Sequence, residues 1–300
     1  MIKVLVIAGP TATGKSKMAI ECAKRYGGEI ISIDSQQVYQ ELNIGTAKTT
    51  DTESIKHYGI DLISYDQAFS VADSQKYARA CIDIIHQNHH LPILVGGTGL
   101  YINAILYDYV FDPQTKSLSH LEEYETKQLY ERLLLIDQVS ALQIHPNNRK
   151  RIIRALEISE SGQLKSSIEE AQNHQYLYDV CMIALNYPRD ILHQRIEDRV
   201  DDMFKAGLED EVLKYFSASD TQKYQSFLAI GYKEFKPYLN QAASLSEVRN
   251  QIIFHTRQFA KRQITWFKNQ NTALWVDMSD QASIDQMHTV IDQWLNKETL

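Results

Sequence analysis

One eight-residue stretch near the start of the chain limits its possible folds more than any other feature. Residues 9–16 read GPTATGKS, which matches G-x-x-x-x-G-K-[ST]. In this pattern backbone N–H groups surround phosphate oxygens, a lysine neutralises their charge and a hydroxyl reaches Mg²⁺. The loop consists of Gly9, Pro10, Thr11, Ala12, Thr13, Gly14, Lys15 and Ser16. It predicts a diphosphate or nucleotide site with Ser16 as the metal ligand, but it does not specify a reaction.

The sequence around this loop predicts a strand before it and a helix after it. The apolar run VLVIA precedes the loop, and KMAIECAKRY follows it. Phosphates would then lie at the positive end of the helix. Further short strands are expected at residues 29–34, 60–63 and 92–95, with a helix at 70–87 opened by a capping box of Ser70 and Asp73. This alternation predicts an α/β fold: a P-loop NTPase-like parallel sheet with ligands at the carboxyl ends of its strands.

The pattern changes between residues 110 and 177, which are rich in Glu, Gln and Lys and show no convincing strand. Strand patterns return at 178–185 and 273–276, with helical sequence between them. We therefore predict a catalytic core made of residues 1–109 and 178–300, with a helical C-terminal part. Residues 110–177 are predicted to form a helical insertion.

Charge and composition narrow the class of protein. The 300 residues include 31 basic and 38 acidic side chains, which give a formal net charge of −7. This charge argues against a protein that coats nucleic acid with a generally basic surface. Two acid-free basic stretches, NNRKRIIR at 147–154 and RQFAKRQITWFK at 257–268, leave open an RNA-binding patch or a solvated helix face. With no recognisable signal peptide or membrane-spanning run, and three separated cysteines in apolar surroundings, we expect a cytoplasmic protein. Nothing in the sequence requires more than a monomer.

Asp34 lies in an unusual place for a P-loop protein. Kinases and NTPases with this loop usually carry a second acid at the end of an apolar strand, to hold Mg²⁺. Here the strand PILV ends in Gly96-Gly97-Thr98, and the acid is Asp34 at the end of the earlier run IISID. From the residue type alone, Asp34 is a metal ligand, a helix cap or a general base.

Seven motifs follow one another in a distinctive order: GPTATGKS, ISIDSQQVYQELNIGTAK, LVGGTGLYINA, IHPNNRKRIIRALE, LHQRIEDRVDDMFKAGLEDEV, AIGYKE and TRQFAKRQITWF. Together they resemble the bacterial tRNA dimethylallyltransferases, or tRNA isopentenyltransferases, from about residue 3 to about residue 270. The resemblance implies transfer of a dimethylallyl group from dimethylallyl diphosphate to N6 of adenosine 37, 3′ to the anticodon. The tRNAs are those reading codons that begin with U, and diphosphate is released.

The resemblance also implies a use for the phosphate loop and a set of site residues. Although the loop has the ATP-binding pattern, it would hold the leaving diphosphate, with Mg²⁺ as cofactor and without ATP hydrolysis. Lys15, Ser16 and Arg199 would bind the diphosphate, and Arg195, one helical turn before Arg199, is a candidate assistant. Asp34 would be the general base, with Thr98 beside the channel where the reactants meet. The residues implied in tRNA binding are Asp34, Ser35, Gln36, Gln37, Thr98, Lys150, Arg151, Ile152, Ile153 and Arg154.

One stretch departs from the family pattern. Residues 111–131 are shorter and differently composed than the matching insertion, which carries a tRNA-contacting arginine near its start. No arginine occurs between Val110 and Glu131 in this chain. We therefore assign no tRNA contact there.

Three other functions compete with this interpretation. An adenylate isopentenyltransferase shares the loop and the acid, but the KRIIR and KRQITWF segments favour a polymeric substrate. A small-molecule kinase would need an acid after the PILV strand, where the chain has glycines. A non-enzymatic, nucleotide-dependent RNA-binding module would leave Asp34 and Thr98 unexplained.

Overall fold

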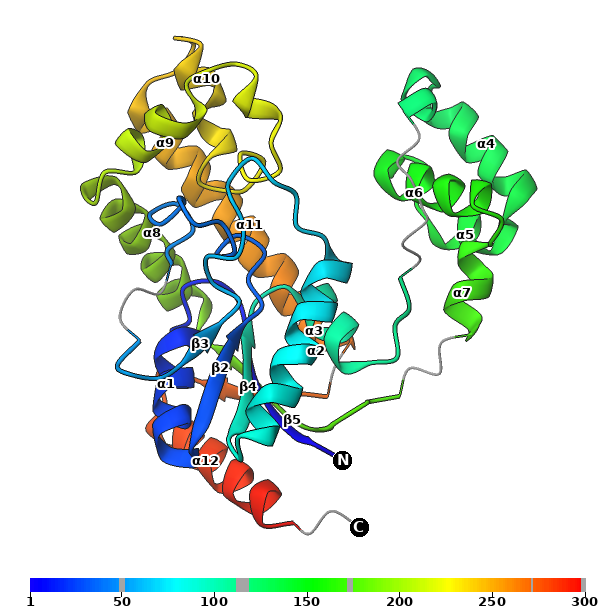
Figure 1. Cartoon of the computed structure of the whole chain (residues 1–300). Helices are drawn as coiled ribbons and strands as arrows, with labels where there is room; N and C mark the ends of the chain where they lie inside the picture. The colour runs from blue at the N-terminus through cyan, green and yellow to red at the C-terminus, as the bar shows by residue number, and fades with distance from the viewer. Residues whose placement is uncertain (49–51, 112–118, 172–174, 271, 298–300) are drawn as a thin grey trace. The chain divides into compact units, whose positions relative to one another are not determined.

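The computed structural model describes residues 1–48, 52–111, 119–171, 175–270 and 272–297. Figure 1 labels many of its helices and strands. The chain divides into two compact units. The first unit contains Met1–Leu106 and Tyr176–Leu300, and the second contains Tyr107–Gln175.

The first unit is built on a six-stranded sheet in the order β3-β2-β4-β1-β5-β6 (Figure 1). Every neighbouring pair of strands is parallel. This arrangement confirms the predicted α/β class with a parallel sheet. The strands are β1 (Lys3–Ala8), β2 (Gly28–Ser32), β3 (His57–Tyr58), β4 (Leu91–Gly96), β5 (Asp179–Asn186) and β6 (Leu274–Asp277).

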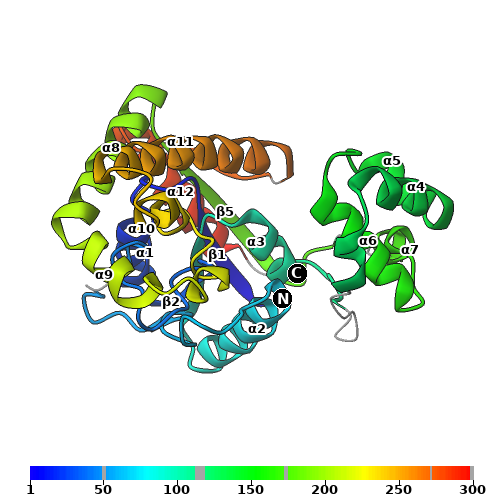
Figure 2. The ribbon, with the colours of Figure 1, turned by 90° about the horizontal axis from the view of Figure 1, so that it is seen from above.

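Helices cover both faces of this sheet. Figure 2 shows α1 (Lys15–Tyr26) and α12 (Gln281–Asn296) on one side of the strands, and α2 (Val71–Gln87) and α3 (Gly99–Leu106) on the other. The central strand β1 is fully buried from Val4 to Ala8, as expected for a parallel strand between two helical layers. The capping box at the start of α2 is present, with Ser70 and Asp73 each bonding the other's backbone N–H.

The prediction of a third strand at residues 60–63 is wrong. The third strand is β3, three residues earlier, and it pairs with Ile30 and Ile31 of β2. The backbone then turns at Gly59 and Asp61, where φ is positive (81° and 56°) and an extended run cannot continue. Only an isolated bridge between Tyr39 and Ile63 remains near the predicted strand.

The C-terminal part of the first unit is mainly helical. It contains α8 (Arg189–Lys205), α9 (Leu208–Phe216), α10 (Lys236–Leu239) and the 26-residue helix α11 (Leu245–Gln270). Aromatic and aliphatic side chains from these helices form a buried cluster with residues that follow β2, including Val38 and Tyr39. This cluster anchors the loops beyond the carboxyl end of β2, where the site lies.

The second unit is a small helical bundle. It contains a 3₁₀ turn (Ser119–Glu123), α4 (Thr126–Ile136), α5 (Gln138–Gln143), α6 (Arg149–Glu160) and α7 (Lys165–Ala171), around a core that includes Leu129, Leu133 and Leu156. Within its described residues the unit contains helices and turns but no strand. Residues 112–118, near the start of the divergent 111–131 stretch, lie outside the described residues. A role of this unit in tRNA binding stays a prediction.

Candidate active site

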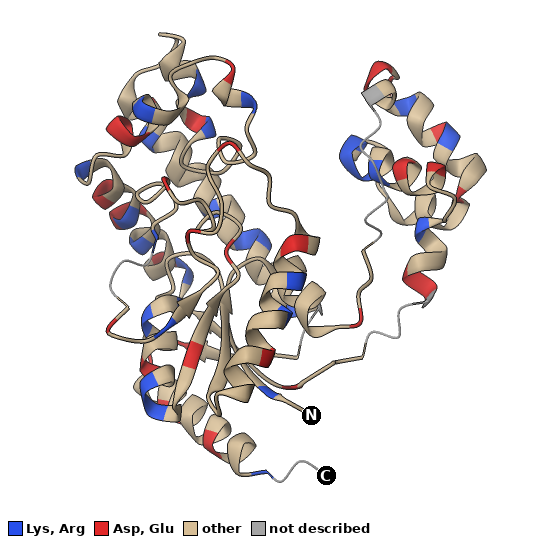
Figure 3. Ribbon diagram, viewed as in Figure 1, with Lys and Arg blue, Asp and Glu red and all other residues tan. Residues whose placement is uncertain are grey.

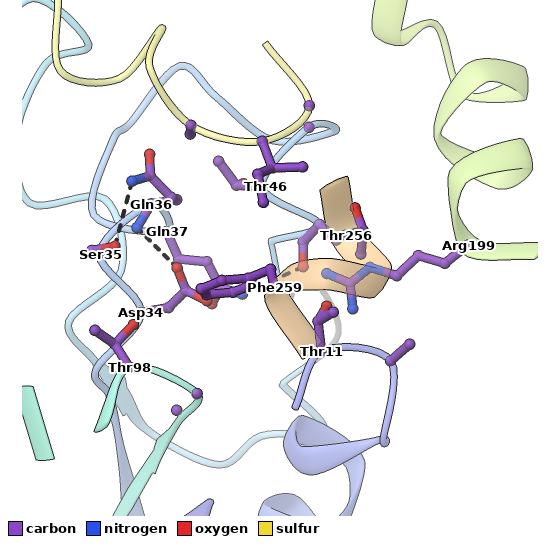
Figure 4. A pocket seen from close by; sticks show the side chains of 18 of the residues that line it. Thr11, Asp34, Ser35, Gln36, Gln37, Thr46, Thr98, Arg199, Thr256 and Phe259 are labelled. Atoms are coloured by element: carbon purple, nitrogen blue, oxygen red, sulfur yellow. Dashed lines mark hydrogen bonds between the residues drawn. The ribbon is translucent and has the colours of Figure 1, made fainter. Parts of the chain in front are cut away.

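A cavity of about 590 Å³ opens in the first unit beyond the carboxyl ends of β1, β2 and β4 (Figure 4). Its lining contains eleven of the predicted site residues: Thr11, Ala12, Gly14, Lys15, Ser16, Asp34, Ser35, Gln36, Gln37, Thr98 and Arg199. Gly9, Pro10 and Thr13 belong to the phosphate loop but not to the lining. Segments far apart in sequence therefore meet at one site.

The phosphate loop is held in shape by its own hydrogen bonds. Thr13 Oγ1 donates to the carbonyl oxygen of Pro10 at 2.8 Å, and Lys15 Nζ donates to the same oxygen at 2.7 Å. Gly14 precedes α1 with φ 84°, in the left-handed region that glycine adopts without strain. The N-terminus of α1, with its partial positive charge, consequently opens on the cavity.

Two cations, Lys15 and Arg199, line this cavity and repel each other. Burial and, to a smaller extent, the nearby Arg199 together lower the pKa of Lys15 to about 7, while Asp34 opposes the shift. Burial also lowers the pKa of Arg199, again opposed by Asp34. Neighbouring buried cations destabilise each other's charge, and an anion between them would relieve this cost. The geometry suits a diphosphate.

Arg195 and Arg199 lie one turn apart on α8 and make different contacts. Arg195 Nε donates to the carbonyl oxygen of Ala12 in the phosphate loop at 2.8 Å, and its guanidinium lies 4.6 Å from the centre of the Tyr187 ring. Arg195 therefore stabilises the phosphate loop through its backbone. Arg199 reaches the cavity itself (Figure 4).

Asp34 lies two residues beyond the end of β2, in the turn that carries Ser35, Gln36 and Gln37. Its Oδ1 accepts the backbone N–H of Gln36 at 2.9 Å, so the carboxylate stabilises this turn rather than capping a helix. Figure 4 shows Asp34, Gln37 and Thr98 on one side of the cavity and Arg199 on the other, with Phe259 between them in this view. Asp34 and Arg199 thus lie on different sides of the cavity in this view.

The lining also contains residues to which sequence analysis gave no role. Polar ones include Thr46, Thr256, Arg262 and Gln263, and apolar ones include Ile196, Val200, Met203, Ile230, Ile252 and Phe259. Several fall inside motifs already noted, such as NIGTAK, AIGYKE and TRQFAKRQITWF, which were the available signal. The apolar side chains give the site a wall suited to a hydrocarbon group next to the predicted diphosphate position.

The basic segment predicted to bind tRNA lies on α6 of the second unit. The side chains of Lys150, Arg151 and Arg154 are exposed, and Figure 3 shows basic positions gathered on this helix. Ile152 and Ile153, also predicted to bind tRNA, are buried in the core of the bundle, so only the three basic residues of the predicted segment are accessible. Arg149 instead donates to the backbone oxygens of Glu122 and Tyr124.

Oxygen donors for a metal are present but sparse. Among the described residues, no group of three or more His, Cys, Asp and Glu side chains is arranged to hold an ion. The Ser16 hydroxyl and the Asp34 carboxylate line the same cavity. This donor set fits Mg²⁺, which keeps several waters and takes substrate phosphate oxygens as ligands. In the described part of the chain, no helix is long and apolar enough to cross a membrane.

Comparisons with known proteins agree on one family. Residues 37–270 match the family model described as IPP transferase. A tRNA dimethylallyltransferase of Staphylococcus saprophyticus is 42% identical over 306 residues, covering 97% of each chain, and one of Exiguobacterium is 45% identical over 284 residues, covering 92% of this chain and 90% of that one.

Solved structures give the same result. A tRNA isopentenylpyrophosphate transferase from Staphylococcus epidermidis matches all of this chain and all of its own, with 39% identity and a TM-score of 0.74. A eukaryotic dimethylallyltransferase acting on tRNA matches 97% of this chain and 78% of its own, with 28% identity and a TM-score of 0.85.

Proposed function

This chain belongs to the IPP transferase family, and from that premise we propose which of its residues carry out the transfer. The reaction moves a dimethylallyl group from dimethylallyl diphosphate to N6 of adenosine 37 of a tRNA and releases diphosphate. The observation that supports this assignment is that two cations, Lys15 and Arg199, and one acid, Asp34, line the same cavity.

Lys15 and Arg199 act on the leaving group. The bond between C1 of the dimethylallyl group and the bridging oxygen breaks with its electron pair on the diphosphate. Negative charge therefore grows where these two cations and the N-terminus of α1 lie. The allylic carbon left behind is electron-poor, and the apolar wall around Phe259 and Ile252 keeps water from it.

Asp34 and Thr98 act on the adenine. The lone pair of N6 is drawn into the purine ring, which makes this amine a poor nucleophile. As N6 bonds to C1, the amine loses a proton, and the Asp34 carboxylate accepts it. An adenine stacked in an anticodon loop must leave its stack to enter this cavity, and Thr98 with the Ser35–Gln37 turn would surround the flipped base.

Mg²⁺ is the proposed cofactor, held by Ser16 and by oxygens of the diphosphate itself. When bound, it would neutralise charge on the leaving group. On the second unit, Lys150, Arg151 and Arg154 would bind the RNA backbone, since their side chains are exposed and basic. We place the enzyme in the cytoplasm as a monomer.

Product analysis tests this function. Purified protein is incubated with dimethylallyl diphosphate, Mg²⁺ and unmodified tRNA, in parallel reactions with and without ATP, and the nucleosides are then separated by mass. We expect prenylated adenosine in equal amount in both reactions. A strict requirement for ATP would instead support a kinase, and prenylation of free AMP in preference to tRNA would support an adenylate isopentenyltransferase.

A further inference from the structure

A buried glutamine on α11 connects two segments of the site that are far apart in sequence. The side chain of Gln263 lies between the phosphate loop and the turn after β4, and the residue is only 6% exposed. Its Oε1 accepts the backbone N–H of Thr11 at 3.1 Å, and its Nε2 donates to the carbonyl oxygen of Gly97 at 2.9 Å. The backbone N–H can only donate and the carbonyl can only accept, so these partners fix the orientation of the amide.

The turn that carries Thr98 fits closely against α11 on both sides of that residue. A Cβ atom on Gly97 would lie 2.2 Å from Nε2 of Gln263, and one on Gly99 would lie 2.0 Å from the ring of Trp266. A side chain added at either position would displace the Gln263 or Trp266 side chain, the turn or α11 itself. The position of Thr98 is therefore determined by the contact of its two neighbours with α11.

We infer that Gln263 is a positioning residue that sets the spacing between the phosphate loop and the Thr98 turn. The inference rests on the proposed function, in which the loop holds the diphosphate and the turn borders the adenine. The forming bond joins atoms held by these two segments, and a misplacement of about 1 Å between reacting groups lowers a rate by roughly 100-fold. A single amide bonded to both segments controls this distance directly.

Other contacts of α11 allow this role to be separated from folding. Arg249 forms ion pairs with Asp201 and Glu197 of α8, and Arg257 also pairs with Glu197. Val248 and Ile252 are buried in the cluster shared with α8 and α9. The helix therefore keeps its place when the Gln263 amide is removed.

The first test replaces Gln263 by methionine, which keeps the length of the side chain but loses both hydrogen bonds. We expect kcat for tRNA prenylation to fall about 10- to 100-fold. KM for dimethylallyl diphosphate and for tRNA should each change by less than about 3-fold, because each segment still binds its own substrate. Gln251→Met, at an exposed position of the same helix, is the matched control and should behave as the native enzyme.

The second test uses Gln263→Glu and pH. An ionised carboxylate still accepts the Thr11 N–H but repels the carbonyl oxygen of Gly97, whereas a protonated one donates its O–H to that oxygen and restores both bonds. The kcat of this variant, divided by that of the native enzyme at the same pH, should rise as the pH is lowered from 8 to 6. The charged side chains of the same cavity are Lys15, Lys17, Asp34, Arg199, Lys233 and Arg262, and the native profile serves as the reference for any pH dependence that the two proteins share.

The outcomes distinguish this inference from the proposed function. If the native enzyme forms no prenylated adenosine, the proposed function fails. If the native enzyme is active and Gln263→Met keeps its kcat, or loses it only in proportion to its folded fraction, the inference alone is overturned. A ratio for Gln263→Glu that stays flat with pH would also overturn it.

Discussion

Oδ1 of Asp34 accepts the backbone N–H of Gln36 at 2.9 Å, so the residue proposed as general base also stabilises the turn in which it lies. These two roles respond differently to substitution. An asparagine keeps an oxygen that can accept the Gln36 N–H, but it has no carboxylate to accept a proton from N6.

We therefore predict that Asp34→Asn slows prenyl transfer by about 10²- to 10⁴-fold while the melting temperature and tRNA binding stay close to native. Single-turnover kinetics with enzyme in excess over tRNA measure the effect. Asp34→Ala removes both roles and serves as the comparison. Normal turnover by Asp34→Asn would show that Asp34 only shapes the turn.

The lowered pKa of Lys15 predicts a proton taken up on binding diphosphate. In the free enzyme its pKa is about 7, so at pH 8 most Lys15 side chains are neutral. A bound anion favours the charged form and raises this pKa, so the affinity for pyrophosphate should fall as the pH rises above 7. Below pH 7, Lys15 is charged in both states and contributes no pH dependence.

Titration calorimetry at pH 8, in two buffers of different ionisation enthalpy, measures this uptake. Pyrophosphate itself titrates in this range, so the informative quantity is the difference between the native enzyme and Lys15→Met. We expect the native enzyme to take up more protons per pyrophosphate bound. Equal uptake by the two proteins would mean that Lys15 is already charged in the free site.

Arg199→Ala should separate handling of the leaving group from binding of RNA. The charge-assisted contact that it removes strengthens as the C–O bond breaks, so the barrier should rise by roughly 2–4 kcal/mol, as for the loss of an oxyanion donor. Inhibition by pyrophosphate should weaken in parallel, while binding of tRNA alone stays near native. Lys205→Ala, at the exposed end of the same helix, is the control. Loss of tRNA binding with intact pyrophosphate inhibition would place Arg199 on the RNA surface instead.

The exposed basic side chains on α6 should contribute to the salt dependence of tRNA binding. Each phosphate contact contributes about 0.7 to 0.9 to the slope of log K against log salt concentration. Replacing Lys150 and Arg154 by alanine should therefore reduce the slope for tRNA by about 1.4 to 1.8. Lys127→Ala, at an exposed position of α4 in the same unit, should leave the slope unchanged. An unchanged slope in the double variant would identify α6 as a solvated face.

The sequence contained the local parts of this site but not the way in which they meet. The phosphate loop and the parallel sheet were predictable because a fixed spacing of residues and a strand–loop–helix pattern determine them locally. The bridge from Gln263 to Thr11 and Gly97 was not, because it joins positions that only the tertiary fold brings together. The shift of the third strand had a similar cause: two residues with positive φ interrupted a run whose apolar content suggested a strand.

The most direct test of the whole account locates the modification on the tRNA. Unmodified tRNA is treated with the enzyme and dimethylallyl diphosphate, cut with a base-specific ribonuclease, and the fragments are sequenced by mass spectrometry. We expect one added dimethylallyl group, on N6 of adenosine 37, formed at least about 100-fold more slowly by Asp34→Asn than by the native enzyme. A dimethylallyl group at another position, or on no nucleotide, would contradict it.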